Sequence, residues 1–140
     1  MQKSKWPKIS VITPTLNSAR TIDEYFKNIK LQKYNGEVEI LIIDGGSTDK
    51  TLKIASENGA KVIFNKLKTA EAGKALGVKK ATGEIYAFID SDNILESDSW
   101  FKKIVNPMVE DPEIIASEPI RFTYRKNDLW LTRYFSLVGV

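Results

Sequence analysis

The sequence predicts an α/β fold: a three-layer sandwich in which a mostly parallel central sheet carries helices on both faces. Short β-branched runs alternate along the chain with segments whose apolar residues recur at helical spacing. In addition, polar residues directly follow three of the strand-like runs, which is where sheets of this kind bind ligands. A chain of 140 residues fits one domain, which we expect to span residues 1–140.

The first half of the chain supplies two strands and two helices. Residues 9–13 form a short run rich in β-branched residues and predict a strand closed by Pro14. A helix follows from residue 21, because apolar residues recur at intervals of three and four: Ile22, Tyr25, Phe26 and Ile29. The nearly continuous apolar run 38–43 predicts a strand buried on both faces. We expect Ser47 or Thr48 to cap a second helix, which ends at residues 58–59.

The second half continues the alternation. Residues 61–64 and 85–89 predict two further strands, and the segment 70–81 between them is rich in Ala and Lys and predicts a helix. Apolar residues between 100 and 108 recur at helical spacing, and residues 114–116 predict a fifth strand. We expect a helix after residue 127, in an apolar end segment that continues beyond residue 140.

The composition narrows the chemistry. The chain has no Cys and no His, which excludes disulfides, thiolate nucleophiles, Ser-His-Asp triads and zinc sites built on those residues. Acid–base or metal chemistry must therefore rest on carboxylates, whose oxygens suit Mg²⁺ or Mn²⁺. The balance of 21 basic and 18 acidic residues gives no reason to expect nucleic acid as a partner. The sequence shows no signal peptide and no membrane-spanning run, so we expect a cytoplasmic protein.

Two carboxylates follow the fourth predicted strand. Asp90 and Asp92 are two residues apart, so in extended chain both side chains point to the same side. Carboxylates this close repel each other unless a cation lies between them. A divalent ion bound in this way completes its shell with water and phosphate oxygens, which indicates an Mg²⁺ or Mn²⁺ diphosphate as ligand. The alternative is a solvated Asp-Ser-Asp turn.

Two more positions are candidates for ligand contacts. Asp44, Gly45 and Gly46 predict a tight turn in which the carboxylate accepts hydrogen bonds from a base or ribose; the alternative is an ordinary strand-to-helix turn. Neither a Walker A sequence nor a G-x-G-x-x-G fingerprint is present. Lys74 lies early in the predicted helix 70–81, where it meets a phosphate or is simply solvated.

These segments, in this order, resemble a known family. Pro-Thr-x-Asn, Asp-Gly-Gly-Ser-Thr-Asp, Ala-Thr-Gly-Glu and Asp-Ser-Asp follow one another as in the family 2 glycosyltransferases of the Rossmann-like GT-A fold, over residues 8 to 110. The resemblance implies a UDP-, GDP- or dTDP-sugar as donor, Mn²⁺ or Mg²⁺ as cofactor, and inversion at the anomeric carbon. The acceptor it implies is a hydroxyl group of a polysaccharide, a glycan or a lipid-linked compound.

The resemblance also implies roles for individual residues. It assigns the nucleotide-sugar to seven residues, which are Pro14, Thr15, Asn17, Asp44, Lys74, Asp90 and Ser91. It assigns the metal to Asp90 and Asp92. The chain departs from the common family pattern where Gly45 replaces a second Asp and where Lys74-Ala75 replaces Arg-Asn. The catalytic base is not identified: four later carboxylates cannot be matched to it and are more simply surface charges, namely Glu110, Asp111, Glu113 and Glu118.

Two other functions stay open at this stage. Haloacid-dehalogenase-like phosphatases also carry D-x-D after a strand, but near the start of the domain, whereas here the motif follows the fourth strand. A non-catalytic nucleotide-sugar-binding module is the other alternative. If the chain is a glycosyltransferase, we expect residues 1–140 to bind the donor but to transfer sugar poorly, because the acceptor-binding half is missing. A longer parent protein would then act at the cytoplasmic face of a membrane, held there by its C-terminal part.

Overall fold

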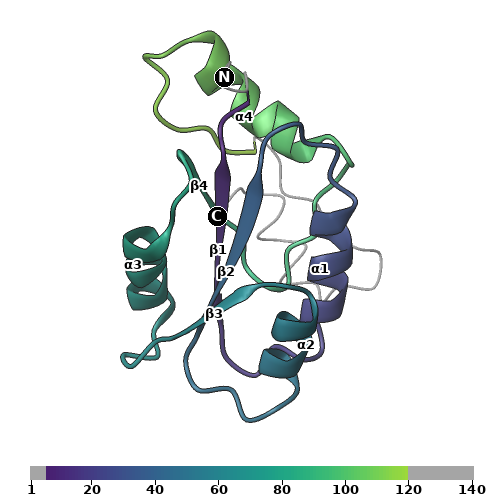
Figure 1. The fold of residues 1–140 in the computed structure, drawn as a ribbon, viewed down its shortest axis with the longest axis vertical. Helices are drawn as coiled ribbons and strands as arrows, with labels where there is room; N and C mark the ends of the chain where they lie inside the picture. The colour runs from purple at the N-terminus through teal and green to yellow at the C-terminus, as the bar shows by residue number, and fades with distance from the viewer. Residues whose placement is uncertain (1–5, 120–140) are drawn as a thin grey trace, which may run out of the picture. The chain divides into compact units, whose positions relative to one another are not determined.

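The computed structural model describes residues 6–119 (Figure 1). Contacts within the chain divide it into two units, residues 1–102 and residues 103–140. The first unit holds the whole sheet and three helices, and it contains every residue predicted to bind donor or metal. The expectation of one domain over residues 1–140 stays a prediction.

Within residues 6–119, the sheet has four parallel strands in the order β3-β2-β1-β4. The strands are β1 (Ile9–Thr15), β2 (Val38–Asp44), β3 (Lys61–Phe64) and β4 (Ile85–Phe88). Ile9 on β1 lies opposite Val38 on one side and Ile85 on the other, so the three strands start level. All four strands overlap runs predicted from the sequence, although β1 continues through Pro14 to Thr15 and β4 ends at Phe88, one residue early. The predicted α/β class is confirmed.

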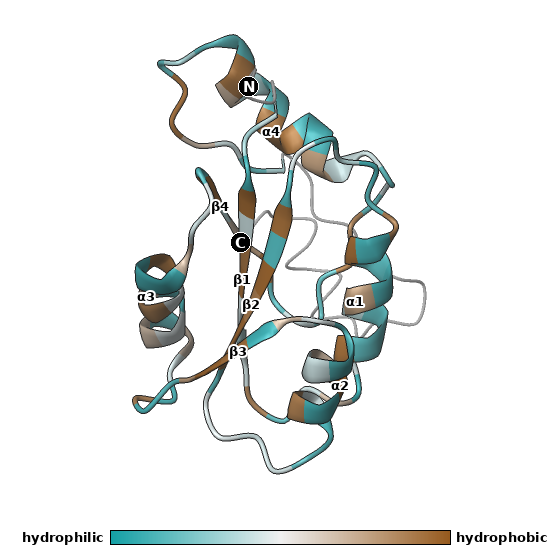
Figure 2. Cartoon of the chain, viewed as in Figure 1, coloured by the Kyte–Doolittle hydropathy of each residue, from teal (hydrophilic) through white to brown (hydrophobic). Residues whose placement is uncertain are grey.

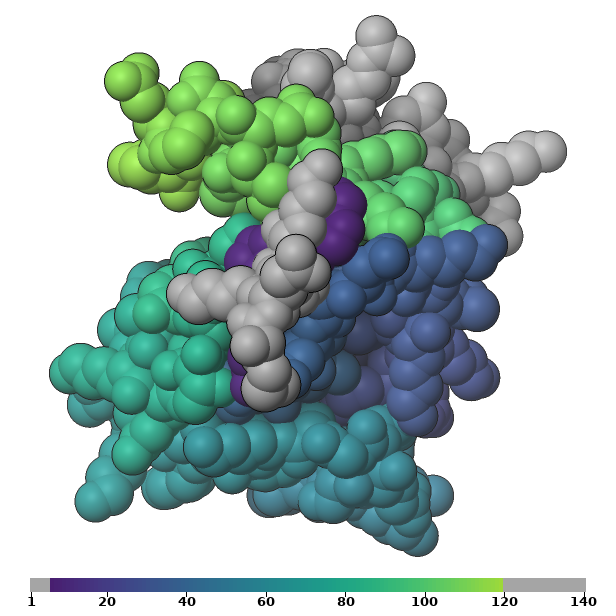
Figure 3. Space-filling view, turned by 45° about the horizontal axis from the view of Figure 1, so that its top comes forward, coloured from purple at the N-terminus to yellow at the C-terminus, as the bar shows by residue number. Residues whose placement is uncertain are grey.

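Helices cover both faces of this sheet. These are α1 (Ile22–Lys30), α2 (Thr51–Glu57) and α3 (Ala70–Lys80); the described residues also form α4 (Trp100–Glu110), most of which belongs to the second unit. Figure 1 shows α3 on one side of the strands and α1 and α2 on the other, and Figure 3 shows the same separation of α3 from α1. None of the helices in residues 6–119 is long and apolar enough to cross a lipid bilayer.

The core lies where β1 and β2 are covered on both faces. Val11 and Ile12 on β1 and Leu41, Ile42 and Ile43 on β2 are fully buried, and Figure 2 shows hydrophobic residues concentrated along these two strands. Burial on both faces explains the continuous apolar run of β2. The predicted apolar face of α1 is also confirmed, since Ile22, Tyr25, Phe26 and Ile29 are all buried.

Two glycines let α3 pack directly against β1. A Cβ atom on Gly73 would lie 3.3 Å from Cβ of Pro14, and one on Gly77 would overlap the side chain of Ile12. A larger residue at either position would push α3 outward. The glycines therefore bring Lys74, which lies between them on this helix, close to the end of β1.

The structure corrects two predictions about elements. Residues 114–116 are not a strand: within residues 6–119 no strand pairs with them, and Ile115 is 92% exposed. Apolar residues form a strand only where a neighbour accepts their backbone hydrogen bonds. Similarly, α2 starts at Thr51 with Lys50 as its N-cap residue, later than predicted, because the Asp49 carboxylate accepts the Thr51 N–H at 2.9 Å. The helix predicted after residue 127 lies outside the described residues.

Candidate functional site

The three predicted polar segments meet at one edge of the sheet. Strand β1 lies between β2 and β4, so the loops that follow these three strands are neighbours at the carboxyl ends. The loop after β1 carries Asn17, the loop after β2 starts at Asp44, and the turn after β4 carries Asp90 and Asp92. The topology therefore brings together residues that are up to 75 positions apart in the chain, from Asn17 to Asp92.

Asp44 is buried and its carboxylate is fully engaged. The residue is 2% exposed. Its Oδ1 accepts hydrogen bonds from the hydroxyl groups of Thr15, at 2.9 Å, and Ser47. Its Oδ2 accepts the backbone N–H groups of Gly46 at 2.8 Å and Ser47 at 2.7 Å. The carboxylate thus shapes the turn after β2, in which Gly46 has a φ of +102° that a side chain would strain.

Asn17 joins the loop after β1 to the loop after β2. Its side-chain oxygen accepts the N–H of Thr48 at 2.9 Å, and its own N–H donates to Ser47 Oγ at 2.8 Å. Asn17 has a φ of +52°, a conformation that asparagine tolerates better than most residues. The Ser18 N–H donates to Thr51 Oγ1 at 2.8 Å, a further hydrogen bond from the loop after β1 to the segment that follows β2. Side chains of both loops therefore lock them together.

Asp49 completes this connection. Its Oδ2 accepts the N–H of Ala19 at 3.0 Å, while Oδ1 accepts the hydroxyl and N–H of Thr51. The hydroxyl of Thr51 is the main cause that holds the pKa of Asp49 below its ordinary value; desolvation opposes it, and backbone N–H groups lower the pKa further. The ionised carboxylate is therefore the form that ties the two loops together.

The turn after β4 is built differently, because its carboxylates are exposed. The Asp90 side chain is 56% exposed, and Asp92 is exposed as well. The backbone closes on itself: the Asp90 N–H donates to Asn93 Oδ1 at 3.0 Å, and the Asn93 N–H donates to the Asp90 carbonyl at 3.0 Å. Ser91 Oγ donates to Ser18 Oγ at 3.0 Å and connects this turn to the loop after β1.

Lys74 lies beside the first of these carboxylates. Its Nζ is 3.8 Å from Asp90 Oδ1, and its side chain is 40% exposed. An ion pair this open is worth little to stability, about 0–1 kcal/mol. The ammonium group is thus held near the carboxylates at small energetic cost, in a place where an anionic ligand can reach it.

The exposed turn fits a divalent cation. Asp90 and Asp92 supply hard carboxylate oxygens on one short turn, the ligand type that Mg²⁺ and Mn²⁺ prefer. Within the described part of the chain, no cluster of three or more acidic residues could hold an ion alone. The remaining ligands would have to be water or oxygens of a bound phosphate compound.

A small cavity lies next to the predicted nucleoside residues. It has a volume of about 180 Å³ and is lined by Pro14 and Thr15 from β1 and by Asn65, Lys68 and Thr69 from the connection between β3 and α3. Asn65 is 4% exposed and shapes this connection, since its Nδ2 donates to the Thr69 carbonyl at 2.8 Å. Pro14 and Thr15 therefore face a hollow, as a nucleoside-binding role requires.

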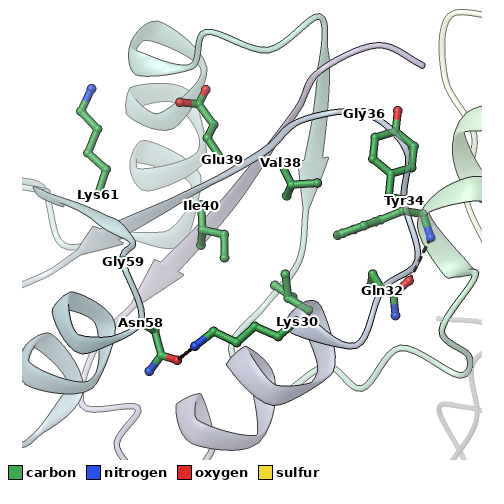
Figure 4. A pocket seen from close by; sticks show the side chains of 12 residues that line it. Lys30, Gln32, Tyr34, Gly36, Val38, Glu39, Ile40, Asn58, Gly59 and Lys61 are labelled. Carbon is green, nitrogen blue, oxygen red and sulfur yellow. Dashed lines mark hydrogen bonds between the residues drawn. The ribbon is translucent and has the colours of Figure 1, made fainter. Parts of the chain in front are cut away.

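A larger cavity, of about 520 Å³, lies at the opposite ends of the strands. Figure 4 shows Val38 and Ile40 at the start of β2 facing Lys30, whose Nζ donates to Asn58 Oδ1 at 2.7 Å. None of the residues predicted to bind donor or metal lines it. Its size alone does not make it the functional site.

Sequence reasoning missed several residues at the carboxyl edge. Ser18 contacts the Asp90–Asp92 turn, and Lys68 lines the small cavity with a φ of +60°. The hydroxyl groups of Thr13 and Tyr25 form a buried hydrogen bond of 2.5 Å, and Thr13 also contacts Ile89, the residue before Asp90. Ser18 could have been found from its place next to Asn17. Nothing in the sequence marks the other three, because each looks like an ordinary strand, helix or loop residue.

Comparison with known proteins identifies the family. Glycosyltransferase AglE of Haloferax volcanii is 26% identical over 144 residues, which cover 98% of this chain and 47% of AglE. The chain thus spans about half the length of this relative. The N-acetylglucosaminyltransferase of Bradyrhizobium elkanii is 28% identical over 135 residues, which cover 91% of this chain and 73% of that protein.

The fold is also that of solved glycosyltransferases. A mannosyltransferase from Pyrobaculum calidifontis, in complex with GDP-Man and Mn²⁺, superposes with a TM-score of 0.60 and 26% identity over 69% of this chain and 33% of the other. The model of the family described as "Glycosyl transferase family 2" matches residues 10–137. Because that match includes most of the sequence, the chain belongs to glycosyl transferase family 2.

Proposed function

We propose that this chain binds a nucleotide-diphosphate sugar together with Mn²⁺ or Mg²⁺, and that it serves the inverting transfer of the sugar to a hydroxyl acceptor. The observation that carries this proposal is the exposed pair Asp90 and Asp92, which lies beside locked loops at the carboxyl edge of the sheet. Two carboxylates on an open turn match a cation that takes its other ligands from a diphosphate.

The solved relative supports the choice of ligand. The Pyrobaculum calidifontis enzyme holds GDP-Man and Mn²⁺, the combination that the turn would need. The family match gives no support to the phosphatase alternative. UDP-, GDP- and dTDP-sugars are all candidate donors for this chain.

The contacts suggest a division of roles among the predicted residues. Asp90 and Asp92 would hold the cation, whose chemistry is to neutralise the charge that grows on the departing diphosphate. Lys74, already 3.8 Å from Asp90, would contact the same diphosphate. Pro14 and Thr15 would border the nucleoside in the small cavity, and Ser91 would lie beside the bound donor.

Asp44 and Asn17 would act differently from the other predicted residues. The carboxylate of Asp44 already accepts four hydrogen bonds and is 2% exposed, so it would shape the loop rather than bind the nucleoside. The Asn17 side chain already accepts the Thr48 N–H. Both residues would therefore support the donor site from behind.

The acceptor and the location of the protein are further parts of the proposal. A glycan or lipid-linked acceptor at the cytoplasmic face of a membrane agrees with the resemblance of the sequence. Because the chain spans 47% of AglE, we propose that residues 1–140 supply the donor side of the reaction. No carboxylate is assigned as the base that deprotonates the acceptor.

Calorimetry tests this proposal. The full 140-residue chain is titrated with UDP-, GDP- and dTDP-sugars, each with and without Mn²⁺, and one of them should bind more tightly with the metal. Asp92→Ala should lose the metal-dependent part, whereas Asp23→Ala, which removes an exposed carboxylate from α1, should not. If no nucleotide binds in a metal-dependent way, the proposal is wrong. Phosphatase activity that Asp90→Asn abolishes would instead favour the phosphatase.

A further inference from the structure

A proline in β1 leaves one buried carbonyl group without its expected partner. In this parallel ladder, the Ile89 N–H donates to the Ile12 carbonyl at 3.3 Å. The next hydrogen bond would run from the N–H of residue 14 back to the Ile89 carbonyl. Residue 14 is proline and has no N–H, so the ladder stops there. Ile89 is 2% exposed, which makes an unpaired carbonyl at this point costly.

A side chain replaces the missing backbone donor. The hydroxyl of Thr13 donates to the Ile89 carbonyl at 2.7 Å, from the residue just before the proline. Thr13 is fully buried, so water does not compete for this carbonyl. The hydrogen bond therefore satisfies the Ile89 carbonyl where the pairing of β1 with β4 ends, one residue before Asp90.

A second hydroxyl group supports the first. The Tyr25 hydroxyl lies 2.5 Å from Thr13 Oγ1. Because the single hydroxyl hydrogen of Thr13 is directed to Ile89, Tyr25 must be the donor in this contact. Tyr25 is 1% exposed, and burial raises its pKa above the ordinary value, which keeps the phenol protonated. The hydrogen bonds therefore all point the same way: Tyr25 of α1 donates to Thr13 of β1, and Thr13 donates to the Ile89 carbonyl just after β4.

We propose that Tyr25, Thr13 and the Ile89 carbonyl form a hydroxyl relay that sets where β4 leaves the sheet and so positions the Asp90–Asp92 turn. A residue with an N–H at position 14 would extend the ladder and hold the chain in the strand. Proline stops the ladder here, the relay holds the Ile89 carbonyl in place of the ladder, and the Asp90 N–H donates to Asn93 Oδ1. Thr13 and Tyr25 are positioning residues, because both are buried and neither can touch a ligand.

The other end of the turn is anchored on the same helix. Asn28, one helical turn after Tyr25, accepts the Leu95 N–H on its Oδ1 at 2.9 Å. Leu95 is 8% exposed. Helix α1 thus holds the chain on both sides of the exposed carboxylates, through the relay before them and through Asn28 after them. The turn can be open to ligands and still keep its place.

Amide hydrogen exchange on the ligand-free 140-residue chain tests the relay directly. Thr13→Val keeps the shape of the side chain and removes the hydroxyl, whereas Thr13→Ser retains it. Loss of the hydrogen bond should speed exchange at residues 89–93 about tenfold more than in the rest of the sheet, and Thr13→Ser should stay within about twofold of wild type. Equal behaviour of the two variants, or acceleration spread evenly over the sheet, would overturn the relay.

Nucleotide binding with and without Mn²⁺ tests whether the relay positions the Asp90–Asp92 turn for the cation, a consequence that rests on the proposed function. Thr13→Val should reduce the gain in affinity from Mn²⁺ about tenfold, while the affinity without Mn²⁺ changes less than about twofold. A general loss of structure would lower both affinities together and would count against positioning. If the wild-type chain shows no Mn²⁺-dependent binding, the proposed function fails while the exchange data still decide on the relay.

Tyr25→Phe provides a milder variant, which serves if Thr13→Val does not fold. It keeps the aromatic ring, which packs edge-on against Phe26 at 5.1 Å between centroids, and removes the donor to Thr13. Exchange at residues 89–93 should rise about threefold, less than in Thr13→Val, because the Thr13–Ile89 hydrogen bond remains. Unchanged exchange at these residues in Tyr25→Phe would exclude Tyr25 from the relay.

Discussion

The loops after β1 and β2 and the turn after β4 lie at the same edge of the sheet, yet they use carboxylates in opposite ways. Asp44 is 2% exposed and accepts four hydrogen bonds from its own and the neighbouring segment. The Asp90 side chain is 56% exposed and has Lys74 at 3.8 Å. A carboxylate with buried donors holds a loop in shape, whereas an exposed one remains available to a cation.

This difference shows how the carboxyl edge of the sheet can have loops of fixed shape and also expose carboxylates that a ligand can reach. Donors from Thr15, Gly46 and Ser47 leave Asp44 little capacity for a ligand. The Asp90–Asp92 turn is held instead by the Asp90 N–H and the Ser91 hydroxyl. Neither hydrogen bond uses a carboxylate oxygen of Asp90 or Asp92. Asp44 and Asp90 both lie at strand ends in the sequence, but in the structure the first is buried among donors and the second is exposed, as the proposed roles require.

The largest expected effect comes from breaking the structural side. Asp44→Ala should lower the free energy of unfolding by about 3 kcal/mol, because the buried donor of Thr15 and the part-buried donors of Gly46 and Ser47 lose their acceptor. Urea denaturation at pH 7 measures this change. Asp92→Ala is the matched control and should change stability by less than about 0.5 kcal/mol. A variant Asp44→Ala as stable as wild type would contradict the structural role.

Breaking the ligand side should spare the fold. Asp92→Ala should weaken Mn²⁺-dependent nucleotide binding at least about tenfold, since even outer-shell partners of a metal contribute this much. Calorimetry with and without Mn²⁺ gives the effect. Equal loss of the metal-independent affinity would indicate that Asp92 acts on the loop and not on the cation.

Removing the charge of Lys74 should have a smaller effect on nucleotide binding than removing the Asp92 carboxylate. Lys74→Gln should weaken nucleotide binding about threefold, since a solvated ammonium contributes a modest attraction to phosphate. Its unfolding free energy should change by less than about 0.5 kcal/mol, because the pair with Asp90 is exposed. The control is Lys79→Gln, which removes a lysine from the last turn of the same helix, α3, and should bind the nucleotide as wild type does. Identical binding of both variants would remove Lys74 from the site.

The smallest effect concerns pH and the connection between the two loops. The pKa of Asp49 is below its ordinary value in the folded chain, chiefly because of the Thr51 hydroxyl. The stability that Asp49 contributes is therefore present above its unfolded pKa of about 3.9 and is lost as pH falls through the folded pKa. Denaturation midpoints between pH 6 and pH 2.5 should fall less steeply in Asp49→Asn than in wild type. Parallel curves would show that Asp49 does not contribute.

Local sequence features were sufficient for much of the fold. The β-branched run before Pro14 and the continuous run before Asp44 each correspond to a strand, because burial on both faces leaves a strong apolar pattern. The predicted location of Asp90 and Asp92 after the fourth strand is also seen. Residues 114–116 show where such patterns fail, since strand formation depends on a partner that apolar character does not specify.

The sequence by itself determined the strands, the helices of the first unit and the identity of the acidic residues at the edge of the sheet, because these follow from local composition and periodicity. The tertiary structure decided the surroundings of each acidic residue: Asp44 is buried among hydrogen-bond donors, whereas Asp90 and Asp92 are exposed. The donors come in part from segments far apart in the chain: Thr15 of β1 donates to Asp44 of β2, and Thr13 of β1 donates to the Ile89 carbonyl just after β4. Such contacts depend on distance in space, which no pattern along one segment records.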